Sequence, residues 1–171
     1  MKFWKSIIIV ALLVEIAGCA NQKPRENFFK DGVSFTCPFD WSVTEQEDID
    51  GAGYYLSVEK RGLNASGLLT LTWINWVTDS HDYLETIQEE FKNQKLLNDL
   101  EFQSARDNSF NGIQSISSDF KFGTLGLKFR GVIHIFIKGK NTYSIVKKEA
   151  IEDISKNKKG FKLIETTFKV E

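Results

Sequence analysis

Alternation of apolar and polar residues is the feature of this chain that most restricts its fold. Leu56 and Val58 alternate with Ser57 and Glu59, which is the period-two pattern of a strand with one buried face. Residues 68–77 are apolar on both parities, which indicates a central strand covered on both faces. A chain with many such segments buries their apolar faces by forming a sheet. The pattern predicts strands at residues 33–37, from 41 onwards, and at 54–58, 68–77, 112–122, 127–137 and 142–148.

Helical spacing appears at two places. Leu84, Ile87 and Phe91 share one face of a helix, and Asp79 or Ser80 can cap its first turn. This helix is expected to cover the sheet with its apolar stripe. Near the C-terminus the spacing predicts two short helices, one over residues 149–157 and a second that begins after Gly160 and carries Phe161, Ile164 and Phe168 on one stripe.

The N-terminal segment has the composition of an export signal. Lys2 and Lys5 precede an apolar run at residues 7–14, which is shorter than the about 20 residues that span a membrane. The run leads into Ile16-Ala17-Gly18-Cys19, which resembles the lipobox of bacterial lipoproteins. The alternative is an ordinary secretory signal with a cysteine near its cleavage point.

In the lipoprotein family the cysteine of the lipobox is lipidated and becomes the first mature residue. The resemblance therefore implies that Cys19 is the lipidation site and that signal peptidase recognises Ile16, Ala17 and Gly18. It divides the chain into a signal peptide at residues 1–18, a lipidated tether at 19–27 and one folded domain at 28–171.

The charge balance argues against one class of partner. Removal of residues 1–18 takes away Lys2, Lys5 and Glu15 and leaves 153 residues with a formal charge of −2. A near-neutral domain lacks the basic footprint of nucleic-acid-binding proteins, so we expect no nucleic-acid partner. Lysines do gather late in the chain, either as a solvated face or as a contact with anionic lipid headgroups. They are Lys147, Lys148, Lys156, Lys158, Lys159 and Lys162.

The cysteine count leaves no internal disulfide. Once Cys19 is lipidated, Cys37 is the remaining cysteine. Cys37 shares a strand face with Val33 and Phe35, which favours a buried and inert thiol. A catalytic nucleophile and an intermolecular disulfide are the alternatives. A nucleophile would need a neighbouring base, and the sequence marks no histidine as that base.

Four side chains could line a ligand pocket between the sheet and its helices. They are Trp73, Trp76, His81 and His134. Large aromatic residues in a strand belong more often to the core than to a binding site. The histidines are more often structural or exposed than ligands. The pocket is therefore the alternative interpretation of these residues.

Two short acidic segments resemble metal sites at first sight. Asp79-Ser80-His81-Asp82 places carboxylate and imidazole groups within one turn, but a metal site needs three or four converging ligands, and helix capping explains the segment as well. Asp48-Ile49-Asp50-Gly51 lacks two obligatory carboxylates of a calcium loop. Residues 45–53 are therefore expected to form a hairpin loop. We expect neither a metal nor another cofactor.

From about residue 28 to residue 170 the chain resembles the PsbP-like family, whose fold is shared with the Ran-binding Mog proteins and with bacterial lipoproteins such as DcrB. The resemblance is carried by Gly32-Val33-Ser34-Phe35, Pro38-Phe39-Asp40-Trp41, Lys140-Asn141-Thr142-Tyr143-Ser144-Ile145, Gly160-Phe161 and Thr166-Thr167-Phe168. Asp40 stands where the family usually has glycine. The resemblance implies an α+β domain in which helices sandwich an antiparallel sheet, in proteins that bind or assist other proteins. The family offers no catalytic residues to transfer to this chain.

Two functions follow as hypotheses. The lipobox and the resemblance favour a non-enzymatic lipoprotein of the bacterial cell envelope that binds a protein partner and is held at the membrane by its N-terminal lipid. The alternative is an enzyme or small-ligand carrier that uses the aromatic pocket. The residue after Cys19 is Ala20 and not the aspartate that is associated with inner-membrane retention. Lipoprotein sorting therefore implies the periplasmic face of the outer membrane if the host has two membranes.

Overall fold

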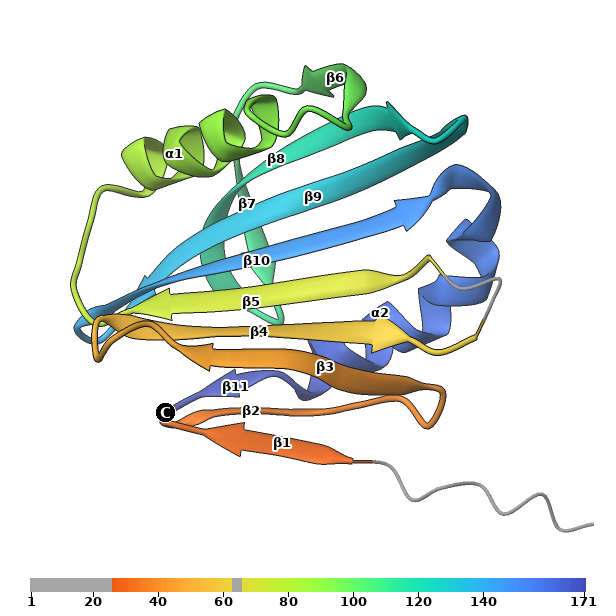
Figure 1. Ribbon diagram of the computed structural model, residues 1–171. Helices are drawn as coiled ribbons and strands as arrows, with labels where there is room; N and C mark the ends of the chain where they lie inside the picture. Colours follow the sequence, from red (N-terminus) through yellow and green to blue (C-terminus); the bar gives the residue numbers. More distant parts are fainter. Residues whose placement is uncertain (1–25, 63–65) are drawn as a thin grey trace, which may run out of the picture.

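The computed structural model describes residues 26–62 and 66–171, so the lipobox and the signal-peptide prediction lie outside the described residues. An eight-stranded antiparallel sheet forms the centre of the described part (Figure 1). The predicted central strand, β5, lies between β4 and β10. The strand order is β3 (Trp41–Asp48), β4 (Gly53–Lys60), β5 (Leu68–Ile74), β10 (Asn141–Ala150), β9 (Leu127–Lys138), β8 (Ile113–Thr124) and β6 (Asn98–Phe102), and β7 (Arg106–Phe110) pairs with the other half of β8.

A second sheet brings the two ends of the described chain together. Its three antiparallel strands are β1 (Asn27–Lys30), β2 (Val33–Thr36) and β11 (Lys169–Val170), with β2 in the middle. A side-chain bond adds to this closure, because the backbone N–H of Thr36 donates to Oγ1 of Thr167 at 3.0 Å. The last residues of the chain therefore complete the fold.

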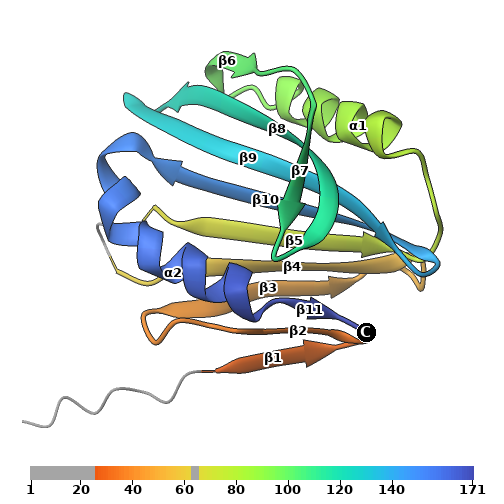
Figure 2. The same ribbon diagram turned by 180° about the vertical axis from the view of Figure 1, so that it is seen from behind.

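Helices cover opposite faces of the large sheet. The helix α1 (Ser80–Lys92) packs on β8 and β9 on one face (Figure 1). The helix α2 (Ile154–Thr167), which follows the 3-10 turn η1 (Ile151–Asp153), lies on the other face (Figure 2). This arrangement confirms the predicted α+β sandwich of an antiparallel sheet and flanking helices.

Each face of the sheet has its own apolar core. Along β10, the side chain of Ile145 packs on the α2 side and that of the next residue, Val146, on the α1 side, as alternation in a strand requires. The core on the α2 side contains Trp41, Trp73, Tyr143, Phe136, Phe161 and Ile164 among others. The core on the α1 side contains the predicted helix stripe Leu84, Ile87 and Phe91, packed on Phe120, Ile133 and Ile135.

Several predicted boundaries differ from the structure. The predicted hairpin loop at 45–53 is shorter, because β3 continues to Asp48 and the turn is built on Asp50-Gly51, both with positive φ. The strand predicted at 68–77 ends at Ile74. Two strands, β6 and β7, form where the sequence lacked clear alternation. Their residues are mostly exposed at the sheet edge, so burial imposes no pattern on them.

The two predicted C-terminal helices are one continuous helix. Gly160, predicted to follow a helix C-cap, lies inside α2. A Cβ atom at this position would lie 2.5 Å from Nε1 of Trp41. The glycine is therefore required by the close approach of α2 to Trp41 rather than by a helix end.

Candidate functional site: a cationic groove beside the C-terminal helix

An open groove of about 1660 Å³ lies between α2 and the sheet. Along β10, Tyr143 and Ile145 are buried on the face that α2 covers, and the next two residues of that face, Lys147 and Glu149, line the groove. The strand pattern therefore continues from core to groove without a change of face. The other lining residues are Pro38, Phe39, Asp40, Trp41, Gln103, Asp119, Phe120, Lys121, Arg130, Gly131, Val132, Lys148, Ile154, Lys156, Lys158, Lys159, Gly160, Phe161, Lys162, Leu163, Glu165 and Thr166.

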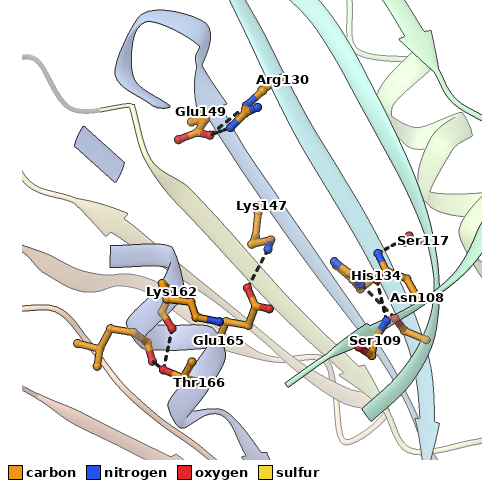
Figure 3. Close-up of polar contacts among 12 residues, drawn as sticks. Asn108, Ser109, Ser117, Arg130, His134, Lys147, Glu149, Lys162, Glu165 and Thr166 are labelled. Carbon is orange, nitrogen blue, oxygen red and sulfur yellow. Dashed lines mark hydrogen bonds and ion pairs between the residues drawn. The ribbon is translucent and has the colours of Figure 1, made fainter. Parts of the chain in front are cut away.

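Ion pairs tie the walls of the groove together (Figure 3). Between neighbouring strands, Nε and Nη2 of Arg130 donate to Oε1 of Glu149 at 3.1 and 2.8 Å. Between sheet and helix, Nζ of Lys147 donates to Oε2 of Glu165 at 3.3 Å. The aliphatic and aromatic surroundings of Lys147 include the ring of Phe110, whose centroid lies 5.5 Å from Nζ. The first pair thus joins β9 to β10, and the second joins β10 to α2.

The groove carries an excess of positive charge. Eight cationic residues and four carboxylate residues line it. Within the described part of the chain, Lys121, Lys158, Lys159 and Lys162 form no ion pair. Three of these four lie on α2 and belong to the lysine-rich stretch that the sequence analysis singled out. The structure thus places most of that stretch on one wall of the groove.

One carboxylate of the groove retains an unused acceptor. The side chain of Glu149 is 10% exposed, and its Oε1 accepts both bonds from Arg130. Its Oε2 is buried and receives no hydrogen bond from the residues that the structure describes. An unsatisfied buried acceptor is costly, so the geometry of the Arg130–Glu149 pair is maintained at some cost to stability.

A polar cluster lies on the same face of the sheet, outside the groove lining, with Ser115, Ser117 and His134 buried and Asn108 exposed. Nδ1 of His134 and Oγ of Ser115 are 3.1 Å apart, and Nδ2 of Asn108 donates to Oγ of Ser117 at 2.9 Å (Figure 3). Burial, assisted by the positive charge of Lys147, lowers the pKa of His134 to about 4. The imidazole is therefore neutral at physiological pH and serves as a buried hydrogen-bonding group.

The structure does not bring the four predicted pocket residues together. Trp73 is a core residue, 1% exposed, that stacks on Tyr54 with ring centroids 4.9 Å apart. Trp76 lies beyond the end of β5 and is half exposed. His81 is exposed in the first turn of α1 and lines a shallow hollow, whereas His134 is buried between strands. Strand alternation placed Trp73 correctly but could not show that β5 ends before Trp76.

The two segments that resembled metal sites have structural roles. Asp79 caps α1, since its Oδ1 accepts hydrogen bonds from the backbone N–H groups of His81 and Asp82 at 2.8 and 3.2 Å. These bonds lower the pKa of Asp79. In the second segment, Oδ1 of Asp48 accepts from the N–H of Gly51 at 2.7 Å and closes the hairpin turn. In residues 26–62 and 66–171, no group of three or more His, Cys, Asp and Glu side chains could hold a metal ion.

The structure also shows the environment of Cys37 and the length of the described helices. Cys37 is a fully buried free thiol, as its strand pattern predicted. Burial, with a smaller contribution from Glu26, raises its pKa to about 11, so the reactive thiolate is scarce at neutral pH. Neither described helix has the length and hydropathy of a membrane-spanning segment.

Sequence reasoning missed most of the groove. Arg130, Glu149 and Glu165 were not singled out, because they come from β9, β10 and α2 and nothing in local spacing shows that they meet. One usable signal was the alternation of faces along β10, which places Lys147 and Glu149 on the same face as Tyr143 and Ile145.

Comparison with known proteins identifies the fold. No protein-family model and no curated protein matches this chain. The solved structure of the cyanobacterial PsbP protein CyanoP from Synechocystis sp. PCC 6803 matches with a TM-score of 0.57 and 12% identity over 86% of this chain and 91% of CyanoP. The predicted PsbP-like fold is therefore confirmed.

Two further solved structures are similar. A protein from Bacteroides thetaiotaomicron VPI-5482 matches with a TM-score of 0.55 and 14% identity over 85% of this chain. This chain spans about half of that protein, 48% of its length. LpqN of Mycobacterium tuberculosis, described as involved in cell envelope biogenesis, has a TM-score of 0.49 and 10% identity over 88% of this chain and 87% of LpqN.

Proposed function

We propose that this chain with a PsbP-like fold is a lipid-anchored protein of the bacterial cell envelope that binds an acidic protein segment in the cationic groove and catalyses no reaction. The anchor is Cys19, and the groove beside α2 is the binding site. The observation that carries the proposal is the groove itself, a large open surface with unpaired lysines on one wall.

The size of the groove favours a polypeptide over a small molecule. Pockets for small ligands measure roughly 300–1,000 Å³ and enclose most of their ligand. The groove measures about 1660 Å³ and is open along the helix. An extended or helical segment of a partner protein fills such a groove better than a small ligand does.

The charge of the groove favours an acidic segment. Lys158 and Lys162 stand one helical turn apart on α2, both are exposed, and neither is neutralised by a carboxylate of the described chain. A partner carboxylate would meet two cations at this wall. Complementary charge of this kind favours specificity and fast association.

The alternative of an enzyme or small-ligand carrier has less support. Its proposed pocket residues lie in four different environments, as described above. The close pair Ser115 and His134 is buried, and no carboxylate among the described residues is hydrogen-bonded to the imidazole. A triad would require that third group to orient the base.

Photocrosslinking in cells tests the groove. Thr166 and Thr86 are a matched pair, because each is exposed on a helix and donates its hydroxyl to the backbone carbonyl four residues earlier. Thr166 lines the groove and Thr86 lies on α1. We expect p-benzoylphenylalanine at position 166 to form an adduct with a defined protein, and the same probe at position 86 to form none.

Charge variants test whether the adduct depends on the lysines of the groove. The double substitution Lys158→Gln with Lys162→Gln should reduce the adduct from position 166. Lys138→Gln with Lys140→Gln, which removes the same charge from the exposed β9–β10 hairpin, should not reduce it. Equal adducts from positions 166 and 86, or equal loss in both double variants, would refute the groove as the binding site.

A further inference from the structure

The turn between β8 and β9 breaks a rule that three other turns of the described residues obey. In four turns a residue with positive φ is followed by a glycine with positive φ. Such turns favour Asn, Asp or Gly at the first position, because a bulky side chain is disfavoured in the left-handed region. The four pairs are Asp31-Gly32, Asp50-Gly51, Asn111-Gly112 and Leu125-Gly126.

In the fourth turn, the side chain of Leu125 is not buried by the domain. Leu125 has a φ of 49° and is 91% exposed. A branched apolar residue there combines a strained backbone with an unburied side chain. Positions that break a local rule without a compensating contact in the fold are where functional sites are expected.

Two more exposed leucines lie at the same corner. Leu127, 44% exposed, is the first residue of β9 after the turn. Leu96, 76% exposed, precedes β6, whose residue Asn98 pairs with Gly123 at the end of β8. We name Leu96, Leu125 and Leu127 the leucine corner.

Two stacked phenylalanine rings lie beneath the leucine corner, and lysines flank it. Beneath the turn, the rings of Phe122 and Phe129 stack with centroids 5.0 Å apart and planes 8° apart. The charged residues around it are the exposed Lys95, Lys121 and Lys128, with Asp99 and Glu101 as the nearby carboxylates. Apolar side chains between cations match the boundary of a bilayer, with acyl chains below and phosphate groups above.

The turn between β8 and β9 lies at the same end of the strands as the beginning of β1, although at the opposite edge of the molecule (Figure 1). The strand registers establish this independently: Phe129 pairs with Ala150 at the end of β10, and Lys148 with Leu68 at the start of β5. On the next strands Lys60 pairs with Trp41, and the N–H of Cys37 donates to the carbonyl of Glu26. Strand ends near the leucine corner and the chain at Glu26 thus share one end of the sandwich.

The anchor of the proposed function would hold this end near a membrane. Six residues lie between Cys19 and Glu26, and the seven steps from one to the other reach at most about 25 Å. We propose that the leucine corner inserts into the headgroup and acyl boundary of the anionic bilayer that carries the anchor, so that the domain docks with this end down. The orientation rests on the proposed anchor at Cys19.

A fluorescent reporter in the full chain tests the docking. Leu125→Cys places a thiol at the tip, and Asp50→Cys places one at the corresponding position of the turn between β3 and β4, at the opposite end of the strands. Both carry an environment-sensitive fluorophore, and the unsubstituted chain, treated in parallel, gives the background from Cys19 and Cys37. The membrane-extracted protein is reconstituted into vesicles of phosphatidylethanolamine with phosphatidylglycerol and into vesicles of phosphatidylcholine alone.

We expect the label at position 125 to shift to shorter wavelength in the anionic vesicles and to be quenched by brominated acyl chains, with a smaller shift in phosphatidylcholine. The label at position 50 should report water in both kinds of vesicle.

Three other outcomes would decide against parts of this account. If the protein floats with the vesicles while the label at 125 reports water, docking is refuted and the anchor stays in place. A shift at 125 that brominated lipid does not quench overturns it too, because the leucine corner then contacts protein. A shift and quenching with unmodified Cys19 would support docking and refute the anchor.

Discussion

Gly160 of α2 lies directly against the indole of Trp41, at the start of β3. A Cβ atom on Gly160 would lie 2.5 Å from Nε1 and 2.6 Å from Cε2 of that ring. Gly67, directly before β5, approaches the same ring, and a Cβ there would lie 2.6 Å from Cη2. The indole thus contacts two glycines closely, and it makes an edge contact with the ring of Phe161 with centroids 4.9 Å apart.

We predict that Gly160→Ala destabilises the protein. In an exposed helix this substitution would stabilise by about 1 kcal/mol, but here the added methyl forces α2 away from Trp41 and should cost about 1–3 kcal/mol. Urea unfolding followed by circular dichroism measures the change. In a Trp41→Phe background the ring is smaller, so the cost of Gly160→Ala should fall; an unchanged cost would contradict the contact.

The unpaired lysines of α2 should bind acidic peptides. We predict that a fluorescein-labelled polyglutamate peptide binds the protein weakly, and that Lys158→Gln with Lys162→Gln weakens binding about three- to tenfold, because each exposed cation contributes up to about 1 kcal/mol. Fluorescence anisotropy measures the affinity, and added salt should weaken it. The control Lys138→Gln with Lys140→Gln should bind like the parent chain. Similar losses in both variants would mean that overall charge, not the groove, attracts the peptide.

His134 should make stability depend on pH. Its pKa is lowered to about 4 by burial and by Lys147, so between pH 6.5 and 4 the unfolded state binds more protons than the folded state. The free energy of unfolding should therefore fall as the pH falls through this range, by about 3 kcal/mol at pH 4 from this group.

A comparison with His134→Gln isolates the histidine from the carboxylates. Urea unfolding of both proteins at several pH values between 7 and 4 gives the two slopes. The variant should lose less stability over this range even if it starts from a lower value. Parallel curves would show that His134 is not held neutral.

The turn at Leu125 offers a separate test of strain. We predict that Leu125→Asn raises the free energy of unfolding by about 1 kcal/mol, because asparagine tolerates the left-handed conformation and the exposed leucine makes little contact to lose. Thermal unfolding in solution measures the effect. A lower melting temperature in the variant would show that Leu125 stabilises the fold through contacts that its exposure does not reveal.

The inner strands of the large sheet and α1 could be predicted from the sequence because burial leaves a periodic pattern in them, whereas the exposed edge strands β6 and β7 carry no such pattern. Leu84, Ile87 and Phe91 illustrate this, since all three are buried on one face. Gly160 shows the limit: a glycine after several lysines looks like a helix end, and only the position of Trp41, over a hundred residues earlier, explains it. The groove escaped prediction for the same reason. Lys147 and Glu165 form an ion pair between strand and helix that no local pattern encodes.

Attachment to a membrane through Cys19 is the central claim, because the cellular location and the orientation of the leucine corner both follow from it. Intact-mass spectrometry of the protein, purified from membranes of bacteria that produce the full chain, tests it most directly. We predict a mature chain that begins at Cys19 and carries the added mass of acyl chains. A chain that keeps residues 1–18, or that begins at an unmodified Cys19, would contradict the account.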